Sequence, residues 1–305
     1  MPPVDISLVV CTRNRARQLP PCLQAIAAME GVESCQVIVV DNGSTDATRQ
    51  LVTEFAAGTP RVRIEYVHEA RAGLSRARNR GLREVRAPLV LFTDDDCYPD
   101  RSYLREARNV FADPAIHYFG GRVLLHDPSD ARITIQESTE RRLFTPFAEI
   151  VPGVIHGANM GFRRRVFEQV GGFNVLLGAG TRLKCAEDTE LIARASAVGL
   201  AGGYFPEPTV SHHHGRKESD ADALMRGYDV GRGAFFVAMA RHRRVRIQYL
   251  KRWYWSLAWN RKARFLRELG GACRFIGASM WATLARRNPV PKPPAPAVTG
   301  RSAGT

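Results

Sequence analysis

The feature that most constrains the fold of this chain is an alternation of short apolar segments with segments of helical character in its N-terminal third. The apolar segments occupy residues 6–11, 36–40, 62–67 and 89–92. Helices are predicted between them at residues 19–29, 46–57 and 74–85. Strands about 25–30 residues apart with a helix between them are typical of βαβ units. The sequence therefore predicts an α/β fold with a mainly parallel sheet.

The rest of the chain continues with mixed elements before it becomes helical. The pattern predicts a helix at 102–111, a strand at 117–125, an irregular region at 126–152, helices at 163–170 and 187–198, a strand at 201–205, and helices at 221–241 and 247–286. The last helix is expected to break near Gly270 and Gly271. Residues 288–305 are rich in proline, alanine and glycine, which predicts disorder.

Three adjacent carboxylates, Asp94, Asp95 and Asp96, follow the fourth apolar segment directly. Carboxylates this close repel one another and resist burial unless a cation compensates their charge. Mg²⁺ and Mn²⁺ are typically held by a few carboxylates together with substrate phosphates. The run therefore suggests an enzyme that acts on a phosphorylated donor, although solvated turns can also be rich in aspartate.

Polar segments also follow the first two strands, at residues 11–14 and 41–44. In an open parallel sheet, ligands bind beyond the carboxyl ends of the strands, so these segments and the aspartate run are expected to meet at one edge. Asp41 can accept hydrogen bonds from a base or a ribose, or the segment can be a turn that caps a helix. No G-x-G-x-x-G follows the first strand and no G-x-x-x-x-G-K-[ST] is present, which argues against a dinucleotide site and a P-loop.

The positive charge of the chain is concentrated near its C-terminus. The formal net charge is +14, and residues 241–287 contain thirteen lysines and arginines but only one acid, Glu268. Tryptophans and a tyrosine are interleaved with these cations at Trp253, Tyr254, Trp255 and Trp259. Such a segment suits a helix at the surface of an anionic membrane, here residues 243–285. A solvated basic helix with buried aromatic residues is the plainer alternative, and nucleic acid is the less favoured partner.

The cysteines and the N-terminal sequence indicate in which cellular compartment the protein is expected. Six cysteines are scattered without a C-x-x-C pair, which favours free thiols in a reducing compartment. The N-terminus lacks the pattern of a secretory signal, and no stretch has the roughly 20 apolar residues of a membrane-spanning helix. We expect a cytoplasmic protein, with peripheral association at the inner face of the cell membrane as an option.

Seven motifs occur in an order that resembles a known family. They are VVCTRNR (9–15), VIVVDNGSTDAT (37–48), RAGLSRARNRGL (71–82), FTDDDCYPD (92–100), GANMGFRRRVFEQVGGF (157–173), AEDTEL (186–191) and the histidines at 212–214. Together they resemble the family 2 glycosyltransferases over about residues 4–235. The resemblance implies a GT-A fold, a mainly parallel nucleotide-binding sheet flanked by helices. On this basis we predict a glycosyltransferase domain at 1–240, a basic helical extension at 241–287 and a tail at 288–305.

The resemblance also implies sites for a nucleotide-sugar donor. Thr12, Arg13 and Asp41 would hold the base and ribose, and Arg71, Arg76 and Asn79 would line the nucleotide pocket. Asp94 would approach the ribose, with Asp95 next to it. The segment that contains Gly157 and Asn159 would contact the donor sugar or the acceptor.

A metal ion and a general base are part of the same expectation. Asp96 and His212 would bind Mn²⁺ or Mg²⁺ at the donor diphosphate. The family motif is D-x-D, so three consecutive aspartates leave the pair ambiguous by one position, and His214 is an alternative to His212. Inverting transfer needs one base on the acceptor hydroxyl, and Asp188 is the expected base. Glu187 is the alternative base, or else contacts the acceptor, and two acids in the first turn of a helix can also simply complement its dipole.

The resulting prediction is a metal-dependent, inverting glycosyltransferase that uses a nucleotide-sugar donor, expected to be UDP-linked. The acceptor is expected to be a glycan, a lipid-linked glycan or another hydroxyl compound. A nucleotidyltransferase that makes nucleotide sugars is one alternative, although it would normally carry a glycine-rich phosphate loop after the first strand. A nucleic-acid-binding protein that uses the basic C-terminal segment is the other alternative.

Overall fold

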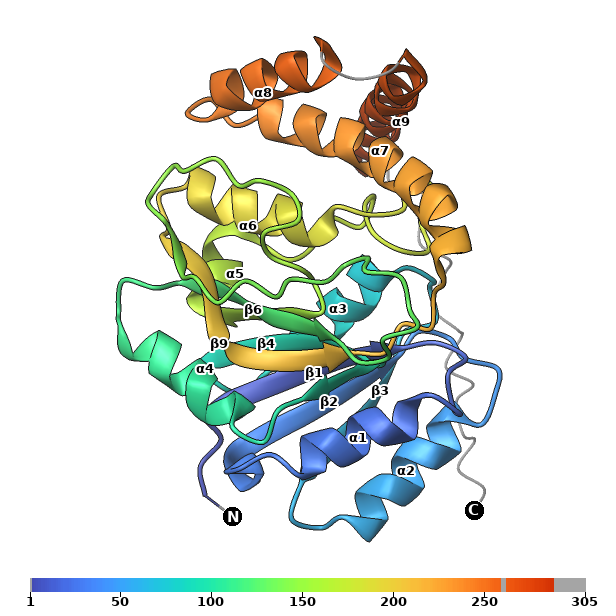
Figure 1. Ribbon diagram of the computed structural model, residues 1–305, viewed down its shortest axis with the longest axis vertical. Helices are drawn as coiled ribbons and strands as arrows, with labels where there is room; N and C mark the ends of the chain where they lie inside the picture. The colour runs from blue at the N-terminus through green and yellow to red at the C-terminus, as the bar shows by residue number, and fades with distance from the viewer. Residues whose placement is uncertain (1, 259–261, 288–305) are drawn as a thin grey trace, which may run out of the picture.

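The computed structural model describes residues 2–258 and 262–287, and one mixed β-sheet forms the centre of this part of the chain (Figure 1). The strand order is β3-β2-β1-β4-β8-β6-β9-β5, and β7 pairs with β9 outside this path. The strands are β1 (Ile6–Thr12), β2 (Cys35–Asp41), β3 (Arg63–His68), β4 (Leu89–Asp94), β5 (Cys97–Pro99), β6 (Tyr118–Leu125), β7 (Arg142–Phe144), β8 (Asn159–Arg163) and β9 (Gly202–His212).

The first four strands of this order confirm the predicted parallel βαβ arrangement. β1 pairs in parallel with β2 and β4, and β2 pairs in parallel with β3. The second half is mixed, because β8 runs antiparallel to both β4 and β6 while β6 runs parallel to β9. The helices are α1 (Leu19–Ala27), η1 (Val32–Ser34), α2 (Thr48–Gly58), α3 (Leu74–Leu82), α4 (Tyr103–Ala112), α5 (Arg165–Val170), α6 (Glu187–Ala197), α7 (Glu218–Ala240), α8 (Arg246–Ala258) and α9 (Lys262–Arg287).

Helices cover both faces of the sheet, and the alternation of side chains along the strands builds a core on each face. On β1, Leu8 and Val10 belong to the core that includes Leu23 of α1 and Tyr103 of α4. Val9 points the other way, into the core formed with α3, α5 and α6. Because both faces are buried, β1 and β2 are apolar along nearly their whole length.

The helix predicted at 163–170 is confirmed as α5, which begins two residues later, at Arg165. The strand β8 at residues 159–163, directly before this helix, was not predicted. Gly161 in β8 allows the close packing, since a Cβ there would lie 2.3 Å from the Phe119 ring of β6. This strand was not predicted because a glycine and an arginine interrupt its apolar pattern, although it is paired on both sides.

The last strand is longer than the predicted 201–205, because β9 continues through Pro206 and Pro208 to His212. The pairing of β6 with β9 shifts register between the Gly120–Tyr204 and Arg122–Thr209 pairs. At a bulge of this kind, residues of the strand have no pairing partner. A proline there does not remove a hydrogen bond of the sheet, so the strand tolerates both prolines. This extension carries His212 into the sheet. The 126–152 region is mostly irregular as predicted, apart from β7.

Three helices follow the sheet, and the glycines expected to break the last one lie inside α9. Gly271 is where α9 approaches α7 closely: a Cβ there would lie 2.0 Å from the Val230 carbonyl oxygen. Gly233 of α7 faces α9 in the same way, with a Cβ position 1.8 Å from the Glu268 carbonyl oxygen. Two helices can approach this closely only where side chains are absent.

The predicted division at residue 240 stays a prediction. α7, on the N-terminal side of that boundary, packs against α9 on the other side. Among the described helices, none combines the length and the apolar character that crossing a membrane requires. Trp259 and the predicted tail at 288–305 lie outside the described residues.

Candidate active site

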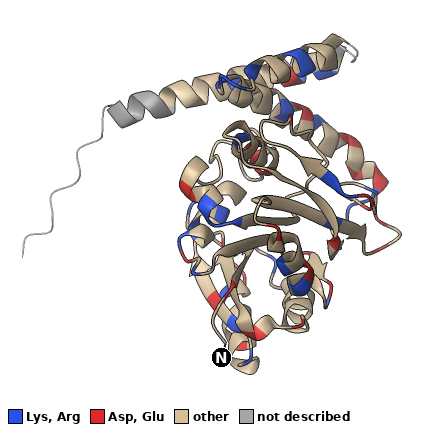
Figure 2. Cartoon of the chain, turned by 90° about the vertical axis from the view of Figure 1, so that its left-hand side faces the viewer, with Lys and Arg blue, Asp and Glu red and all other residues tan. Residues whose placement is uncertain are grey.

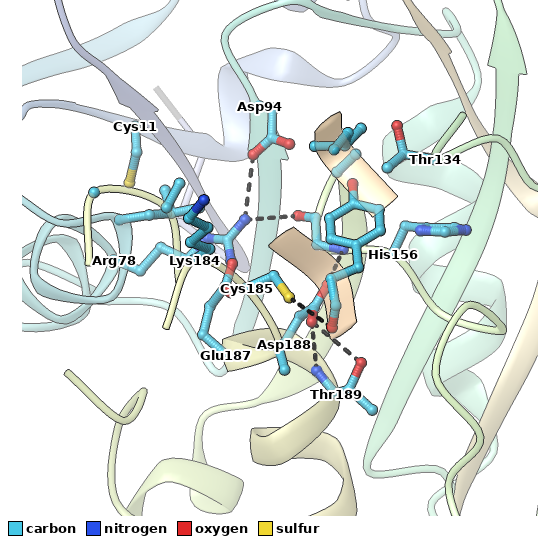
Figure 3. A pocket seen from close by; sticks show the side chains of 18 of the residues that line it. Cys11, Arg78, Asp94, Thr134, His156, Lys184, Cys185, Glu187, Asp188 and Thr189 are labelled. Carbon is cyan, nitrogen blue, oxygen red and sulfur yellow. Dashed lines mark hydrogen bonds and ion pairs between the residues drawn. The ribbon is translucent and has the colours of Figure 1, made fainter. Parts of the chain in front are cut away.

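A pocket of about 760 Å³ lies where the carboxyl ends of β1 and β4 meet the N-terminus of α6 and the end of β9 (Figure 3). α7 contributes a further wall through Tyr228 and Arg232. The predicted site residues that line this pocket are Thr12, Arg13, Asp94, Asp95, Asp96, Gly157, Glu187, Asp188 and His212. Strand-end residues from distant parts of the sequence therefore converge at one edge of the sheet, as expected from its topology.

Arg78 of α3 is the most connected side chain of this pocket, and it is 2% exposed. One guanidinium nitrogen donates to Glu187 Oε1 at 3.0 Å. The other donates to Asp94 Oδ1 and to the Gly157 carbonyl oxygen, each at 3.2 Å. One buried cation thus holds β4, α6 and the loop before β8 together, as the dashed lines in Figure 3 show.

Glu187 is buried at the start of α6, and burial raises its pKa to about 7. The neighbouring Asp188 carboxylate raises the pKa further, and Arg78 lowers it only in part. A carboxyl group in this environment exchanges its proton near neutral pH. Ala186, just before it, has a left-handed backbone with φ 78°. Strained backbone at a non-glycine residue is often found at functional sites.

A Glu187→Gln variant is expected to change how stability depends on pH. The folded pKa of Glu187 lies above its ordinary 4.5, so the folded state binds the proton more tightly than the unfolded state. This contribution to stability is fully present below about pH 4.5 and is lost as the pH rises through about 7. When the pH is raised from 5 to 8, the free energy of unfolding of the variant should therefore increase by about 1–3 kcal/mol relative to that of the wild type.

Urea unfolding at pH 5 and pH 8, without metal or nucleotide, measures this difference. Glu54→Gln removes one negative charge from an exposed position on α2 and serves as the control. A stability difference between wild type and Glu187→Gln that stays constant across this range would contradict the prediction.

Asp188 is half-buried in the first turn of α6 and presents its carboxylate to the pocket. Its Oδ2 accepts a hydrogen bond of 2.8 Å from the Gly157 backbone nitrogen, and its Oδ1 accepts one of 2.6 Å from the Thr189 backbone nitrogen. A Cβ at residue 157 would lie 3.1 Å from Asp188 Oδ2 and 2.8 Å from Arg78, so this close approach requires glycine. The backbone thus fixes the orientation of the Asp188 carboxylate.

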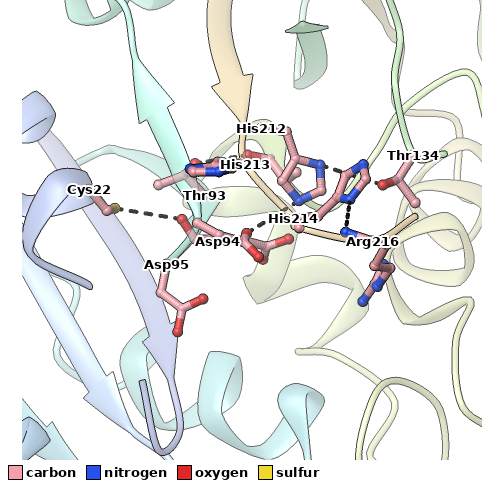
Figure 4. Close-up of polar contacts among 12 residues, drawn as sticks. Cys22, Thr93, Asp94, Asp95, Thr134, His212, His213, His214 and Arg216 are labelled. Atoms are coloured by element: carbon pink, nitrogen blue, oxygen red, sulfur yellow. Dashed lines mark hydrogen bonds and ion pairs between the residues drawn. The ribbon is translucent and has the colours of Figure 1, made fainter. Parts of the chain in front are cut away.

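Asp95 and Asp96 share one cation, Arg15, which follows β1. Figure 4 shows Asp94 and Asp95 at the end of β4 and His212 at the end of β9, on the other side of this group. The guanidinium lies 3.1 Å from Asp95 Oδ1 and 2.6 Å from Asp96 Oδ2. On the other side of Asp96, His212 Nε2 lies 3.2 Å from Oδ1. The short strand β5 explains this contact: it runs antiparallel to β9 with Cys97 opposite His212, which brings the residue before Cys97 next to the histidine.

The two aspartates differ in protonation although both contact Arg15. Burial raises the pKa of Asp95 to about 7, because Arg15 offsets it only partly and Asp96 adds a like charge. Burial would raise the pKa of Asp96 too, but the hydrogen bond and charge of His212, together with Arg15, lower it to about 2. Asp96 is therefore more readily ionised than Asp95.

Asp96 and His212 present ligand atoms that, with the thiol of Cys97, lie within 4.8 Å of one another. A carboxylate in the turn before β5 and an imidazole at the end of β9 fit a divalent ion of the first transition series. His214 differs from His212, because its Nδ1 accepts the Arg216 backbone N–H and it does not line the pocket. A second acid–histidine group, Asp127, Asp130 and His213, lies outside the pocket, and the Lys217 ammonium already contacts Asp130 there.

Five predicted residues do not line the pocket: Asp41, Arg71, Arg76, Asn79 and Asn159. Asp41 Oδ2 accepts a hydrogen bond from the Tyr66 hydroxyl, and Asp41 Oδ1 accepts the Ser44 backbone N–H, so it organises the turn after β2. Arg71 is exposed beside Glu69. Arg76 is half-buried next to Gly73, at the start of α3.

The amides of Asn79 and Asn159 are both used within the protein. Asn79 exchanges two hydrogen bonds with the Phe173 backbone, at 2.7 and 2.8 Å. Asn159 is fully buried, accepts from the Tyr103 hydroxyl, and donates to the carbonyl oxygens of Arg122 and Pro208. Both side chains therefore hold the walls of the site in place and do not face its interior.

Sequence reasoning missed Arg15, Arg78 and His156, which all line the pocket. The buried residues of α3 include Ala77 and Gly81, and the helical spacing places Arg78 on the same side. An arginine on the apolar side of a helix needs a carboxylate partner. The helical pattern of the sequence could therefore have identified Arg78. Nothing in the sequence pattern distinguishes Arg15 from Arg13, and only Arg13 was predicted to belong to the site.

The fold agrees with comparisons to known proteins. The model of Glycosyl transferase family 2 matches residues 7–171, more than half of the chain, and the chain belongs to this family. The relative AglE, a glycosyltransferase from Haloferax volcanii, is 24% identical over 77% of this chain and 74% of its own length. Validoxylamine A glucosyltransferase from Streptomyces hygroscopicus subsp. jinggangensis is 35% identical over 36% of this chain and 26% of its own length.

Solved structures of glycosyltransferases show the same fold. The mannosyltransferase PcManGT from Pyrobaculum calidifontis, solved with GDP-Man and Mn²⁺, matches with a TM-score of 0.65 and 19% identity, over 94% of this chain and 80% of its own. A fragment of S. aureus TarS, residues 1–349, matches with a TM-score of 0.63 and 17% identity, over 93% and 82%. The protein is therefore a glycosyltransferase with a GT-A fold.

Proposed function

We propose that this protein is a metal-dependent, inverting glycosyltransferase that uses a nucleotide-sugar donor. The observation that carries the proposal is one pocket with two separate acidic groups. Asp94, Asp95 and Asp96 lie at the end of β4, and Asp188 lies at the start of α6. The first group suits a metal–diphosphate complex, and the second suits a base beside the acceptor.

Asp96 and His212 are the residues that would hold the metal, because they offer a carboxylate and an imidazole side by side at 3.2 Å. An imidazole ligand favours Mn²⁺ over Mg²⁺, which prefers oxygen ligands. A bound divalent ion would stabilise the negative charge that develops on the leaving diphosphate. Arg15, now between Asp95 and Asp96, is close enough to serve as a second cation for that charge.

The donor nucleotide would occupy the part of the pocket formed by Thr12, Arg13 and Asp94. Thr12 is buried and Arg13 is exposed at the rim, so both can contact a base or a ribose. We propose a UDP-sugar as donor. Two structural neighbours were solved with UDP-GlcNAc and with GDP-Man, and a direct test has to include both nucleotides.

Asp188 would act as the general base. Inversion requires that the acceptor hydroxyl attacks the anomeric carbon from the side opposite the leaving diphosphate, while a base removes its proton. Backbone N–H groups of Gly157 and Thr189 hold the Asp188 carboxylate and leave acceptor capacity toward the pocket. Glu187 is the weaker candidate, because Arg78 already occupies its carboxylate.

The acceptor is proposed to be a glycan, carried on a lipid or free. α7 forms the pocket wall away from the strand ends, and Tyr228 and Met225 contribute an aromatic and an apolar surface there. Apolar and aromatic side chains of this kind commonly line the pockets of small-molecule ligands. A nucleotidyltransferase is set aside because the chain belongs to a glycosyltransferase family.

A thermal-shift screen tests the donor. Purified protein with Mn²⁺ is mixed with UDP-, GDP- and dTDP-sugars, and a ligand that binds only the folded state raises the melting temperature. We expect a shift with UDP-sugars that is smaller when EDTA is added. If none of the nucleotide sugars raises the melting temperature, with or without Mn²⁺, the proposal is overturned.

An Asp96→Asn variant is expected to bind the donor at least about tenfold more weakly in the presence of Mn²⁺, because it removes a charged metal ligand. Isothermal titration of the nucleotide sugar with and without Mn²⁺ measures the effect. Asp127→Asn is the matched control, since it removes an acid from the group outside the pocket. Equal affinity of wild type and Asp96→Asn, or an equal loss in the control, would remove Asp96 as a ligand.

A further inference from the structure

Helices α8 and α9 lie at the end of the molecule opposite the N-terminus, on the outside of α7 (Figure 1). α8 carries an exposed stripe of large apolar residues there. Ile247, Leu250 and Tyr254 follow the i, i+3, i+7 spacing of one helix face, and Trp255 adjoins them. Trp255 is 59% exposed and Tyr254 is 65% exposed. Aromatic side chains of this size are rarely left in water on a surface helix.

α9 carries a second exposed stripe. Leu266, Leu269, Cys273, Ile276 and Met280 are spaced alternately by three and four residues, which places them along one side of the helix. All five are exposed, with Leu266 at 65%. Together the two helices leave two apolar stripes without a partner in the described part of the chain.

The opposite sides of both helices are well packed. Tyr249 of α8 is fully buried, and its hydroxyl accepts a hydrogen bond of 2.9 Å from the Ile150 backbone nitrogen. Trp253 stacks on Phe236 of α7 and donates to Glu268 of α9 at 3.0 Å. The exposed stripes therefore belong to helices whose orientation is fixed by their buried sides.

Charge on these helices is of one sign at the surface. α8 contains no acid, and the only acid in the described residues of α9 is Glu268, which is fully buried. Arg243, Arg246, Lys251 and Arg274 are exposed on or next to the two helices. Figure 2 shows basic residues along this helical layer.

The chain has four tryptophans, and all four lie within residues 253–281.

We propose that the exposed stripes of α8 and α9 form a docking surface for an anionic lipid bilayer. Apolar and aromatic side chains between exposed cations match the acyl boundary and the negative headgroups of such a bilayer. A second copy of this chain fits less well, because pairing two α9 stripes would bring two sets of cations together without acids to offset them. The helices would lie in the interface, consistent with the lack of a membrane-crossing helix among the described residues.

α9, which carries part of the docking surface, is linked to the pocket on its buried side through Arg232 of α7. This arginine lines the pocket and lies 3.1 Å from both Asp229 Oδ1 and Glu268 Oε1 of α9. If the proposed function holds, docking would place the α7 wall of the pocket near the headgroups, where a lipid-linked acceptor presents its glycan. Vesicle binding itself needs neither donor nor acceptor, so its failure and a failure of the proposed function can be told apart.

Co-sedimentation of the full chain with vesicles tests the proposal. Vesicles of phosphatidylcholine alone are compared with vesicles that contain 30% phosphatidylglycerol, a composition (about one anionic lipid in three) that gives a strongly negative surface. We expect binding to the anionic vesicles only, together with a blue shift of tryptophan fluorescence, because Trp255 would leave water. High salt should weaken the binding.

Three sets of variants separate the contributions. Arg243→Gln/Arg246→Gln/Lys251→Gln should reduce the partition coefficient by at least about tenfold. Tyr254→Gln/Trp255→Gln should also reduce it and, with Trp255 removed, should diminish the blue shift. Arg17→Gln/Arg83→Gln/Arg101→Gln removes the same charge from exposed positions on the body and should bind like the wild type.

Three results would overturn the proposal. The first is a wild-type chain that neither sediments with anionic vesicles nor changes its fluorescence. The second is a control set that loses as much binding as the first set of variants. The third is a dimer, measured by light scattering without lipid, that Leu266→Gln/Leu269→Gln dissociates, which would assign the α9 stripe to a second copy of the chain.

Discussion

An Asp188→Asn variant is expected to lose a factor of about 10²–10⁴ in the rate of sugar transfer, which is the usual contribution of a general base. Asparagine keeps the size of the side chain and can still accept the Gly157 N–H bond, which is 2.8 Å long in the wild type. It cannot take a proton from an acceptor hydroxyl. Single-turnover transfer to an acceptor, with donor affinity measured separately by titration, shows whether chemistry alone is affected.

Donor affinity should stay within a few-fold of the wild type, because Asp188 lies apart from the Asp94–Asp96 group in the sequence and on a different element. Glu187→Gln is the informative comparison, since it changes the adjacent acid. Unchanged turnover in Asp188→Asn would remove it as the base. A large loss in Glu187→Gln alone would move the role to Glu187.

Replacing Arg78 by methionine is expected to have the largest effect on stability, a loss of about 3–5 kcal/mol. Methionine keeps much of the length of the side chain but removes its charge. Glu187 would then remain buried without its cation, and Asp94 would lose its link to α6. Urea unfolding gives the change in free energy, and a drop in donor affinity should accompany it.

Arg80→Met is the matched control on the same helix. Arg80 is partly exposed and forms an ion pair with Glu84 one turn further along. Surface pairs of this kind contribute little, so the control should lose less than about 1 kcal/mol. If Arg78→Met and Arg80→Met are equally stable, the buried contacts of Arg78 do not carry the role assigned to them.

The first half of the fold could be predicted because its signals are local. Apolar strands such as β1 and β2 are buried on both faces, so they stand out in the sequence, and the polar residues after them had to meet at one edge. Asp96, Asp188 and His212 were predicted in this way, or from the resemblance to the family, and the structure brings all three into one pocket.

The remainder depends on tertiary contacts that a sequence does not display. β8 could not be recognised because Gly161 weakens its strand pattern, and its place is set by close packing against Phe119. Asn79 and Arg78 are adjacent and equally polar, yet helical geometry turns one to the Phe173 backbone and the other to the pocket. Gly271 looked like a helix break because a close helix crossing and a break both call for glycine.

The pairing of β5 with β9 has a consequence for how this protein becomes active during folding. In the described residues β5 has no sheet neighbour except β9, so Asp96 meets His212 only after β9 has docked. The chain from β5 to β9 lies between these two residues in the sequence, and forming a contact across so long a segment is slow. If the proposed function holds, a nascent chain would present the turns proposed to bind the nucleotide before it possesses the proposed cation site. Competence for catalysis would then arrive only when β9 pairs with β5.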